Sequence, residues 1–344
     1  MSANRSKSRR WGLLRPELVG LLSVLLLAAP VVGAEAPAAD DETAGQVIPP
    51  ASTVVIRNQL GFAYPDPPTV PSGPPDAALL ETVDGVFSGL REGIDLGELV
   101  EIGESGDPRA AWLLSDLVRF SGPGELRDVS LKAFERLTGA SLADDPVSFR
   151  SVWQSMTDHL IAWDIPALPG YAGWKGQLFT IVDPRWQPFF DDPDSDIDWR
   201  LLSWGGVLMD DRPLGDDRPC PRGCIPALDD PALTDAAGGD WYADDRLVFG
   251  VTVNGESRAY PKHIMEVHEM VNDELGRRRL GIPYCTLCGS AQAYFTDAVP
   301  DGVAPPVLRT SGLLSRSNKV MFDLETFSVF DTFLGKAVSG PLQD

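Results

Sequence analysis

The chain has 344 residues, with 50 acidic against 29 basic side chains and a formal net charge of −21. Its length suggests about two domains, and 43% hydrophobic residues are enough to build a buried core. The surplus of carboxylates argues against a nucleic-acid partner, because phosphate groups are neutralised by a basic surface. We therefore expect a globular protein with a strongly acidic, solvated surface.

The first 34 residues have the three parts of a secretory signal peptide. Five basic residues lie within the first 15 positions, an apolar run follows over residues 18–32, and small residues precede a cleavage site after Ala34. The apolar run is broken by Pro30 and is shorter than the roughly 20 residues that cross a bilayer. We predict a signal peptide over residues 1–34 and an exported protein, periplasmic or extracellular, with no stable membrane span after cleavage. An uncleaved N-terminal anchor is the alternative.

The middle of the chain divides into a linker and a helical region. Residues 35–75 are rich in proline and alanine and lack apolar periodicity, which predicts a linker. Residues 76–200 carry amphipathic stripes typical of helices. An Asp-Pro pair, which favours a helix start, recurs every 38 residues, at positions 107, 145 and 183. This spacing indicates a HEAT-like helical repeat whose surface binds a redox or protein partner. His159 is expected on the surface of its helix.

The pattern changes to short strands and turns over residues 201–344. Asn254-Gly255 is typical of a two-residue hairpin turn, and a helix is predicted from Pro261 through Val271. Six or more predicted strands surround this helix. The sequence therefore predicts an α+β protein, in which a helical N-terminal region precedes a strand-rich domain with one main helix.

The sharpest chemical motif is Cys285-Thr286-Leu287-Cys288. Two thiols at this spacing can close a reducible disulfide or offer two metal ligands. His268 lies on the face that the predicted helix buries, so we expect its ring close to the cysteine turn. The interpretation that we favour is thiol–disulfide redox chemistry, in which Cys285 attacks, Cys288 resolves and His268 modulates the thiolate.

Three alternatives remain open at this stage. Cys285, Cys288 and His268 could instead bind a soft metal ion such as copper(I) or zinc. The protein could also be a non-catalytic interaction protein whose cysteines form static disulfides. A Cys–His hydrolase is less favoured, because no oxyanion-hole or third-residue signature is visible. The sequence thus implies either no cofactor or a soft metal ion.

A second cysteine pair, Cys220 and Cys224, is four residues apart. Together the two pairs give four cysteines in two close pairs, the number and spacing typical of ligands at a structural zinc site. In an oxidising compartment we favour a local structural disulfide between Cys220 and Cys224 over metal binding.

The C-terminal part, roughly residues 201–344, resembles the domain-of-unknown-function family 3179. The motifs that carry the resemblance are, in chain order, Trp204-Gly205-Gly206-Val207, Gly223-Cys224-Ile225-Pro226, Arg258-Ala259-Tyr260-Pro261, His268-Glu269, Tyr284-Cys285-x-Leu287-Cys288-Gly289-Ser290 and Ser311-Gly312-Leu313-Leu314. The family has no established activity. Two departures stand out: residues 210–224 look like an insertion, and relatives continue beyond the position of Asp344, so we expect the C-terminus to be truncated.

Overall fold

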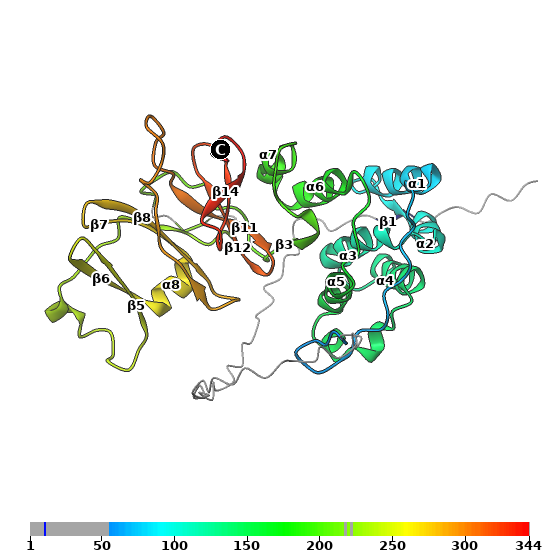
Figure 1. The fold of residues 1–344 in the computed structure, drawn as a ribbon, viewed down its shortest axis with the longest axis horizontal. Coiled ribbons are helices and arrows are strands. Elements are labelled where there is room, and N and C mark those ends of the chain that lie inside the picture. Colours follow the sequence, from blue (N-terminus) through cyan, green and yellow to red (C-terminus); the bar gives the residue numbers. More distant parts are fainter. Residues whose placement is uncertain (1–9, 12–54, 217–218, 221–222, 344) are drawn as a thin grey trace, which may run out of the picture. The chain divides into compact units, whose positions relative to one another are not determined.

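The computed structural model describes residues 10–11, 55–216, 219–220 and 223–343. The predicted signal peptide, apart from Arg10–Trp11, and the first part of the predicted linker lie outside the described residues. The chain forms two compact units, Met1–Pro166 (unit 1) and Ala167–Asp344 (unit 2). Within the described ranges, no helix is long and apolar enough to cross a membrane. Helices dominate unit 1 and strands dominate unit 2, which confirms the predicted α+β class (Figure 1). Among the helices expected from the amphipathic stripes of residues 76–200, one is predicted to begin at Glu125 and to stop at Gly139.

Unit 1 is a set of packed helices. Its elements are β1 (Arg10–Trp11), α1 (Ala77–Ser88), β2 (Ile94–Asp95), α2 (Leu96–Glu104), α3 (Ala111–Phe120), α4 (Glu125–Thr138) and α5 (Val152–Ala162), with 3-10 turns at Pro108–Ala110, Leu142–Asp144 and Pro146–Phe149. Helix α3 is buried on all sides over its first eight residues, and it packs against α4 and α5. Helix α4 ends, as predicted, at Gly139, whose φ of +72° favours glycine.

The recurring Asp-Pro pairs share one local structure. Each aspartate caps a 3-10 turn and accepts a hydrogen bond from the backbone N–H two residues later, at 3.1 Å from Arg109, 3.0 Å from Val147 and 3.1 Å from Arg185. The proline occupies the first position of the turn, where its missing N–H costs nothing. The repeated dipeptide is therefore a repeated cap, and the third copy lies in unit 2.

His159 is fully buried, so its predicted surface position is wrong. Its ring packs against Tyr64 and Phe62 at centroid distances of 4.8 and 5.6 Å, and against Trp163 at 5.1 Å. Its Nδ1 lies 2.8 Å from the carbonyl oxygen of Ser155. The helical pattern could not show this, because two of the covering aromatic residues, Phe62 and Tyr64, belong to the segment that precedes the helices.

Unit 2 begins with helices and continues as layers of strands. Helices α6 (Tyr171–Val182) and α7 (Gln187–Phe190) flank a 3-10 turn at Pro184–Trp186, and further 3-10 turns lie at Trp199–Leu201 and Ala236–Gly239. One antiparallel sheet has the order β14 (Lys336–Ser339), β13 (Val329–Asp331), β12 (Asn318–Asp323), β11 (Leu308–Ser315) and β3 (Leu202–Trp204). The second has the order β10 (Tyr294–Phe295), β8 (Arg278–Cys285), β7 (Met270–Leu275) and β4 (Leu228–Asp229), with β9 (Ser290–Ala291) also paired to β8. A separate hairpin joins β5 (Val248–Val253) to β6 (Glu256–Pro261), followed by α8 (Lys262–His268).

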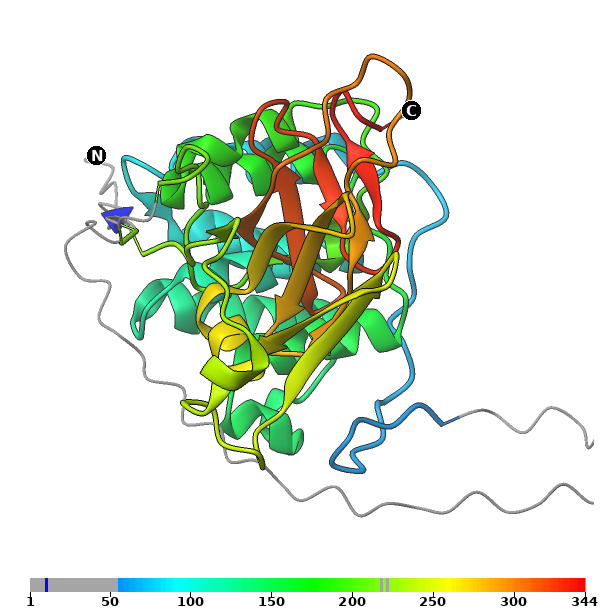
Figure 2. The same ribbon diagram turned by 90° about the vertical axis from the view of Figure 1, so that its left-hand side faces the viewer.

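Two apolar clusters hold these layers together. Met270, Leu308 and Met321 join the two sheets on one face of β7 and β8. On the other face, the β5–β6 hairpin and α8 lie over β7 and β8 (Figure 2). They cover Tyr284 and its neighbours, and Met265 of α8 is fully buried. Strands β7 and β8 are therefore sandwiched, as the almost continuous burial along β8 indicates.

Helix α8 is shorter than predicted, since it ends at His268 rather than at Val271. Glu269 takes a left-handed φ of +54°, and Met270 begins β7, paired with Pro283 of β8. Residues 270–275 therefore obey the strand pairing with residues 278–285 and not the helical period. As a result, the chain reverses next to the end of β8: Tyr284 donates its backbone N–H to the carbonyl of Glu269 at 2.9 Å.

Candidate functional site

The structure brings Cys285 and Cys288 together at the end of β8. Cys285 is the last residue of the strand and is buried, whereas Cys288 lies in the following turn and is exposed. The turn is closed by the N–H of Gly289, which donates to the carbonyl of Cys285 at 2.8 Å. The two Sγ atoms are 2.7 Å apart. One sulfur of an adjacent pair thus faces solvent while the other faces the core.

The sulfur of Cys288 is held between two neighbours. It donates to the backbone carbonyl of Ser317 at 2.7 Å, in the turn between β11 and β12, and it contacts Cys285. Although the residue as a whole is exposed, partial burial of the sulfur is the main reason why the pKa of Cys288 is raised to about 12. The adjacent Cys285 and Glu269 raise this pKa further. Cys288 therefore holds its proton when both thiols are reduced.

A buried lysine lies beneath the cysteines. Lys319 of β12 is 3% exposed, and its Nζ donates to the carbonyl of Glu269 at 2.6 Å and to Oγ1 of Thr310 at 2.8 Å. The Glu269 carboxylate lies 3.5 Å from the same nitrogen. Burial lowers the pKa of Lys319 to about 8, although negative charge at Glu269, Cys285 and Asp210 opposes this shift.

Glu269 connects α8 to the cysteine turn. Its carboxylate accepts a hydrogen bond from the N–H of Thr286 at 3.4 Å, and its backbone carbonyl meets both Tyr284 and Lys319. Sequence reasoning missed Glu269 and Lys319 as site residues. The available signal for Glu269 was its position beside His268 in a family motif. Lys319 gave no signal, because it reaches the cysteines only through the packing of one sheet on the other.

His268 makes its polar contact elsewhere. Its Nδ1 lies 2.7 Å from the backbone carbonyl of Pro226, in the loop before β4. The ring thereby joins α8 to this loop. A role for His268 at the cysteines stays a prediction.

The second cysteine pair lies near a buried carboxylate. The sulfurs of Cys220 and Cys224 are at disulfide distance, with Cα atoms 5.3 Å apart. Asp210 lies close to both, and Cys224 Sγ is 3.7 Å from its Oδ1. This carboxylate already binds Nε of Arg212 at 2.7 Å and the N–H of Ala227 at 2.8 Å. The three residues could converge on a cation, but the aspartate is neutralised and bonded without one.

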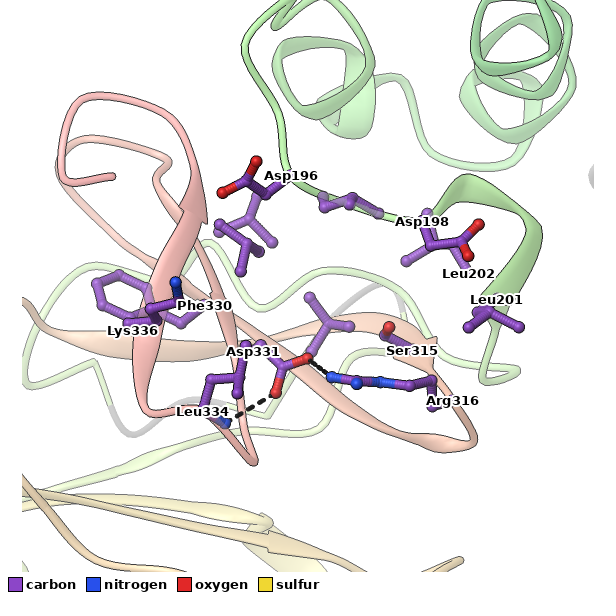
Figure 3. Close-up of a pocket in the computed structure, with 14 residues that line it drawn as sticks. Asp196, Asp198, Leu201, Leu202, Ser315, Arg316, Phe330, Asp331, Leu334 and Lys336 are labelled. Carbon is purple, nitrogen blue, oxygen red and sulfur yellow. Dashed lines mark hydrogen bonds and ion pairs between the residues drawn. The ribbon is translucent and has the colours of Figure 1, made fainter. Parts of the chain in front are cut away.

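A small cavity lies between residues 196–202 and the β11–β14 sheet of unit 2. Its volume is about 260 Å³, and its walls are mostly aliphatic. Figure 3 shows Arg316 paired with Asp331 at its edge, where Asp331 also accepts the N–H of Leu334 at 2.9 Å. The turn that brings Arg316 to this cavity also brings the carbonyl of Ser317 to Cys288.

Comparisons with known proteins were made on the whole chain. A search of curated proteins gave no match, and neither did a search of solved structures. The family model described as "Protein of unknown function (DUF3179)" matches residues 222–344. This stretch runs from the end of the insertion through β4 to β14 and contains Cys285, Cys288, Glu269 and Lys319. The chain therefore carries, over residues 222–344, a domain of the DUF3179 family.

Proposed function

We propose that Cys285 and Cys288 form a thiol–disulfide exchange site. The observation that carries the proposal is the placement of the two sulfurs, 2.7 Å apart with Cys285 buried and Cys288 exposed. An exchanging pair needs one sulfur that an external thiol can reach and a second sulfur within bonding reach of the first. The exposure of Cys288 supports assigning it the contact with the partner, the reverse of the order expected from sequence.

The proposed reaction conserves atoms and electrons. A partner thiolate attacks Cys288 Sγ of the disulfide form, a mixed disulfide forms, and Cys285 leaves as a thiolate. A second partner thiolate then attacks the partner sulfur of the mixed disulfide and releases Cys288. The partner dithiol is oxidised to a disulfide, and two electrons remain on the cysteine pair. The reverse sequence oxidises the pair.

Metal binding is the weaker interpretation of the same residues. Two thiolates bound to one zinc ion at about 2.3 Å are roughly 3.8 Å apart in tetrahedral geometry. The two sulfurs lie closer together than that, and the ammonium of Lys319 would repel a cation at this position. The His268 ring, the third predicted ligand, makes its polar contact with Pro226.

The proposal is tested by equilibrating the full mature chain with mixtures of reduced and oxidised glutathione and counting free thiols by mass spectrometry. We expect the Cys285–Cys288 pair to change between dithiol and disulfide within the range that glutathione buffers. The Cys220→Ser/Cys224→Ser double variant should behave in the same way, since it lacks only the other pair. A pair that stays fully oxidised or fully reduced throughout would contradict the proposal, and stoichiometric zinc or copper in the reduced protein would select the metal alternative.

We also propose that the protein is exported through its first 34 residues. The basic start, the short apolar run and the small residues before Glu35 support this. Mass spectrometry of the protein from the extracytoplasmic fraction should find an N-terminus at Glu35. An intact Met1 end there would contradict cleavage and favour the anchor.

A further inference from the structure

Lys319 is unusual because its buried ammonium has only a loose ion pair, with the Glu269 carboxylate 3.5 Å away. Taking a lysine out of water costs free energy unless it is paired. Both of its hydrogen bonds within 3 Å go to neutral oxygens, the carbonyl of Glu269 and the hydroxyl of Thr310, while the Glu269 carboxylate is 3.5 Å away. The buried Arg309, one residue before Thr310, has by contrast a bidentate carboxylate, with both distances to Asp229 at 2.7 Å. The positive charge of Lys319 can therefore interact with a further anion nearby.

Three groups place negative charge near Lys319, each from a different part of unit 2. They are Glu269 after α8, Asp210 in the loop after β3, and the sulfur of Cys285 at the end of β8. The geometry places Cys285 close to Lys319, because the carbonyl of Glu269 accepts hydrogen bonds both from Lys319 Nζ at 2.6 Å and from the N–H of Tyr284, the residue before Cys285, at 2.9 Å. Of these three groups only Cys285 is changed by oxidation of the pair: a thiolate carries a negative charge and a disulfide sulfur carries none, so the field at Lys319 depends on the redox state.

We propose that Lys319 is a positioning residue that stabilises the Cys285 thiolate and makes the site a disulfide donor to external thiols. The proposal rests on the exchange function proposed above. It adds the direction of electron transfer, which runs from external thiols to the cysteine pair. Stabilising the thiolate favours the reduced pair, and a couple whose reduced form is stabilised is the stronger oxidant. The same charge makes Cys285 the better leaving group when a thiolate attacks Cys288.

The surroundings of Cys288 support the same direction. Partial burial, the partner sulfur and the Glu269 charge raise the pKa of its thiol, which also donates to the carbonyl of Ser317. A protonated thiol is a poor nucleophile, so the exposed sulfur of the reduced pair attacks external disulfides slowly. The exposed sulfur of the oxidised pair, in contrast, is accessible to an incoming thiolate.

The test compares glutathione equilibria of the full mature chain carrying Lys319→Met, Lys319→Arg or Lys336→Met. Lys319→Met removes the charge and keeps a long side chain, Lys319→Arg keeps the charge, and Lys336 is an exposed lysine at the start of β14. We expect Lys319→Met to shift the equilibrium at least about tenfold toward the disulfide, from the loss of one charge interaction. Lys319→Arg should retain most of the wild-type value, and Lys336→Met all of it.

A second measurement avoids dependence on one variant's folding. In the Cys288→Ser protein, the ultraviolet absorbance of the Cys285 thiolate at neutral pH should fall at least about threefold when Lys319 is replaced by Met or by Gln. An equilibrium in Lys319→Met within about twofold of wild type, with unchanged thiolate absorbance, would overturn the role of Lys319. A wild-type pair that does not exchange with glutathione at all would instead overturn the proposed function.

Discussion

The two units differ in how far along the chain their buried ion pairs reach among the described residues. In unit 1, the buried carboxylate of Asp107 binds the guanidinium and the N–H of Arg109, only two residues away. In unit 2, the buried pair Arg309–Asp229 joins residues 80 positions apart, and the contact between Lys319 and Glu269 spans 50 positions. Unit 2 also has local buried pairs, such as Asp210–Arg212, but its long-range pairs depend on the completed sheet, whereas the Asp107–Arg109 pair of unit 1 follows local chain geometry. A site built from such long-range pairs exists only when the sheet has formed.

The largest expected effect is on the exchange chemistry of unit 2. The exposed Cys288 should form a stable mixed disulfide with glutathione in the Cys285→Ser variant, because the internal sulfur that would release it is gone. In the Cys288→Ser variant, Cys285 should react at least about tenfold more slowly even though Lys319 favours its thiolate, because the residue is buried. In Cys285→Ser, by contrast, the sulfur that helps to raise the pKa of Cys288 is gone. Mass spectrometry of quenched time points measures both rates. Faster labelling of Cys285 than of Cys288 would restore the order expected from sequence.

The second prediction compares a long-range charge pair with a surface pair. Arg309→Met leaves the Asp229 carboxylate buried without its guanidinium, which should cost about 3–5 kcal/mol of unfolding free energy. Arg136→Met removes a largely exposed partner of Glu104 in unit 1 and should cost less than about 1 kcal/mol. Urea unfolding of each full-length variant gives the free energies, and hydrogen exchange assigns the loss to a unit. Equal costs would refute the contrast between the units.

The same contrast explains what the sequence could predict. The cap and stop signals of unit 1 act within four residues, so the helix from Glu125 and its end at Gly139 were predicted correctly. The burial of His159 was missed, since Tyr64 and Phe62 reach it from 95 or more residues earlier. In unit 2 the strands were largely found, and the cysteine pair was recognised by its spacing.

The rest of the site could not be read from the sequence, because its members meet only when the two sheets have paired their strands and packed together. The end of α8 was misplaced because the apolar positions after His268 fit both a helix and a strand. Because of that error Glu269 was not recognised as a site residue. Its left-handed backbone conformation turns the chain from α8 into β7 and brings its carboxylate to the cysteine turn. Lys319 is a lone cation within an apolar strand, and only the register of β12 against β11 places it beside Thr310.

The third prediction concerns the pH dependence of unit 2. Because burial lowers the pKa of Lys319 from 10.5 to about 8, the unfolded chain binds more protons than the folded chain between these values. The unfolding free energy should therefore rise from pH 8 to pH 10.5, by on the order of 2 kcal/mol in wild type relative to Lys319→Met. Urea unfolding of the oxidised proteins keeps the cysteine titrations out of the comparison. Parallel pH profiles for the two proteins would contradict this prediction.

The smallest expected effect has the opposite sign and belongs to unit 1. Burial and the nearby Asp145 raise the pKa of Asp158 from 3.8 to about 6, so the folded chain binds the extra proton. Its contribution to stability is fully present below pH 3.8 and is lost as the pH rises through 6. Because Asp158 is only partly buried, we expect the unfolding free energy to change by about 1 kcal/mol.

His159 opposes this trend, since burial lowers its pKa and its protonation on acidification favours the unfolded chain. The comparison is therefore made between wild type and Asp158→Asn, which retain the same His159: the stability of Asp158→Asn relative to wild type should increase as the pH rises from about 4 to 7. A constant difference over this range would show that Asp158 titrates alike in the folded and unfolded chain, and unit 1 would then lack a pH-dependent buried carboxyl at this position.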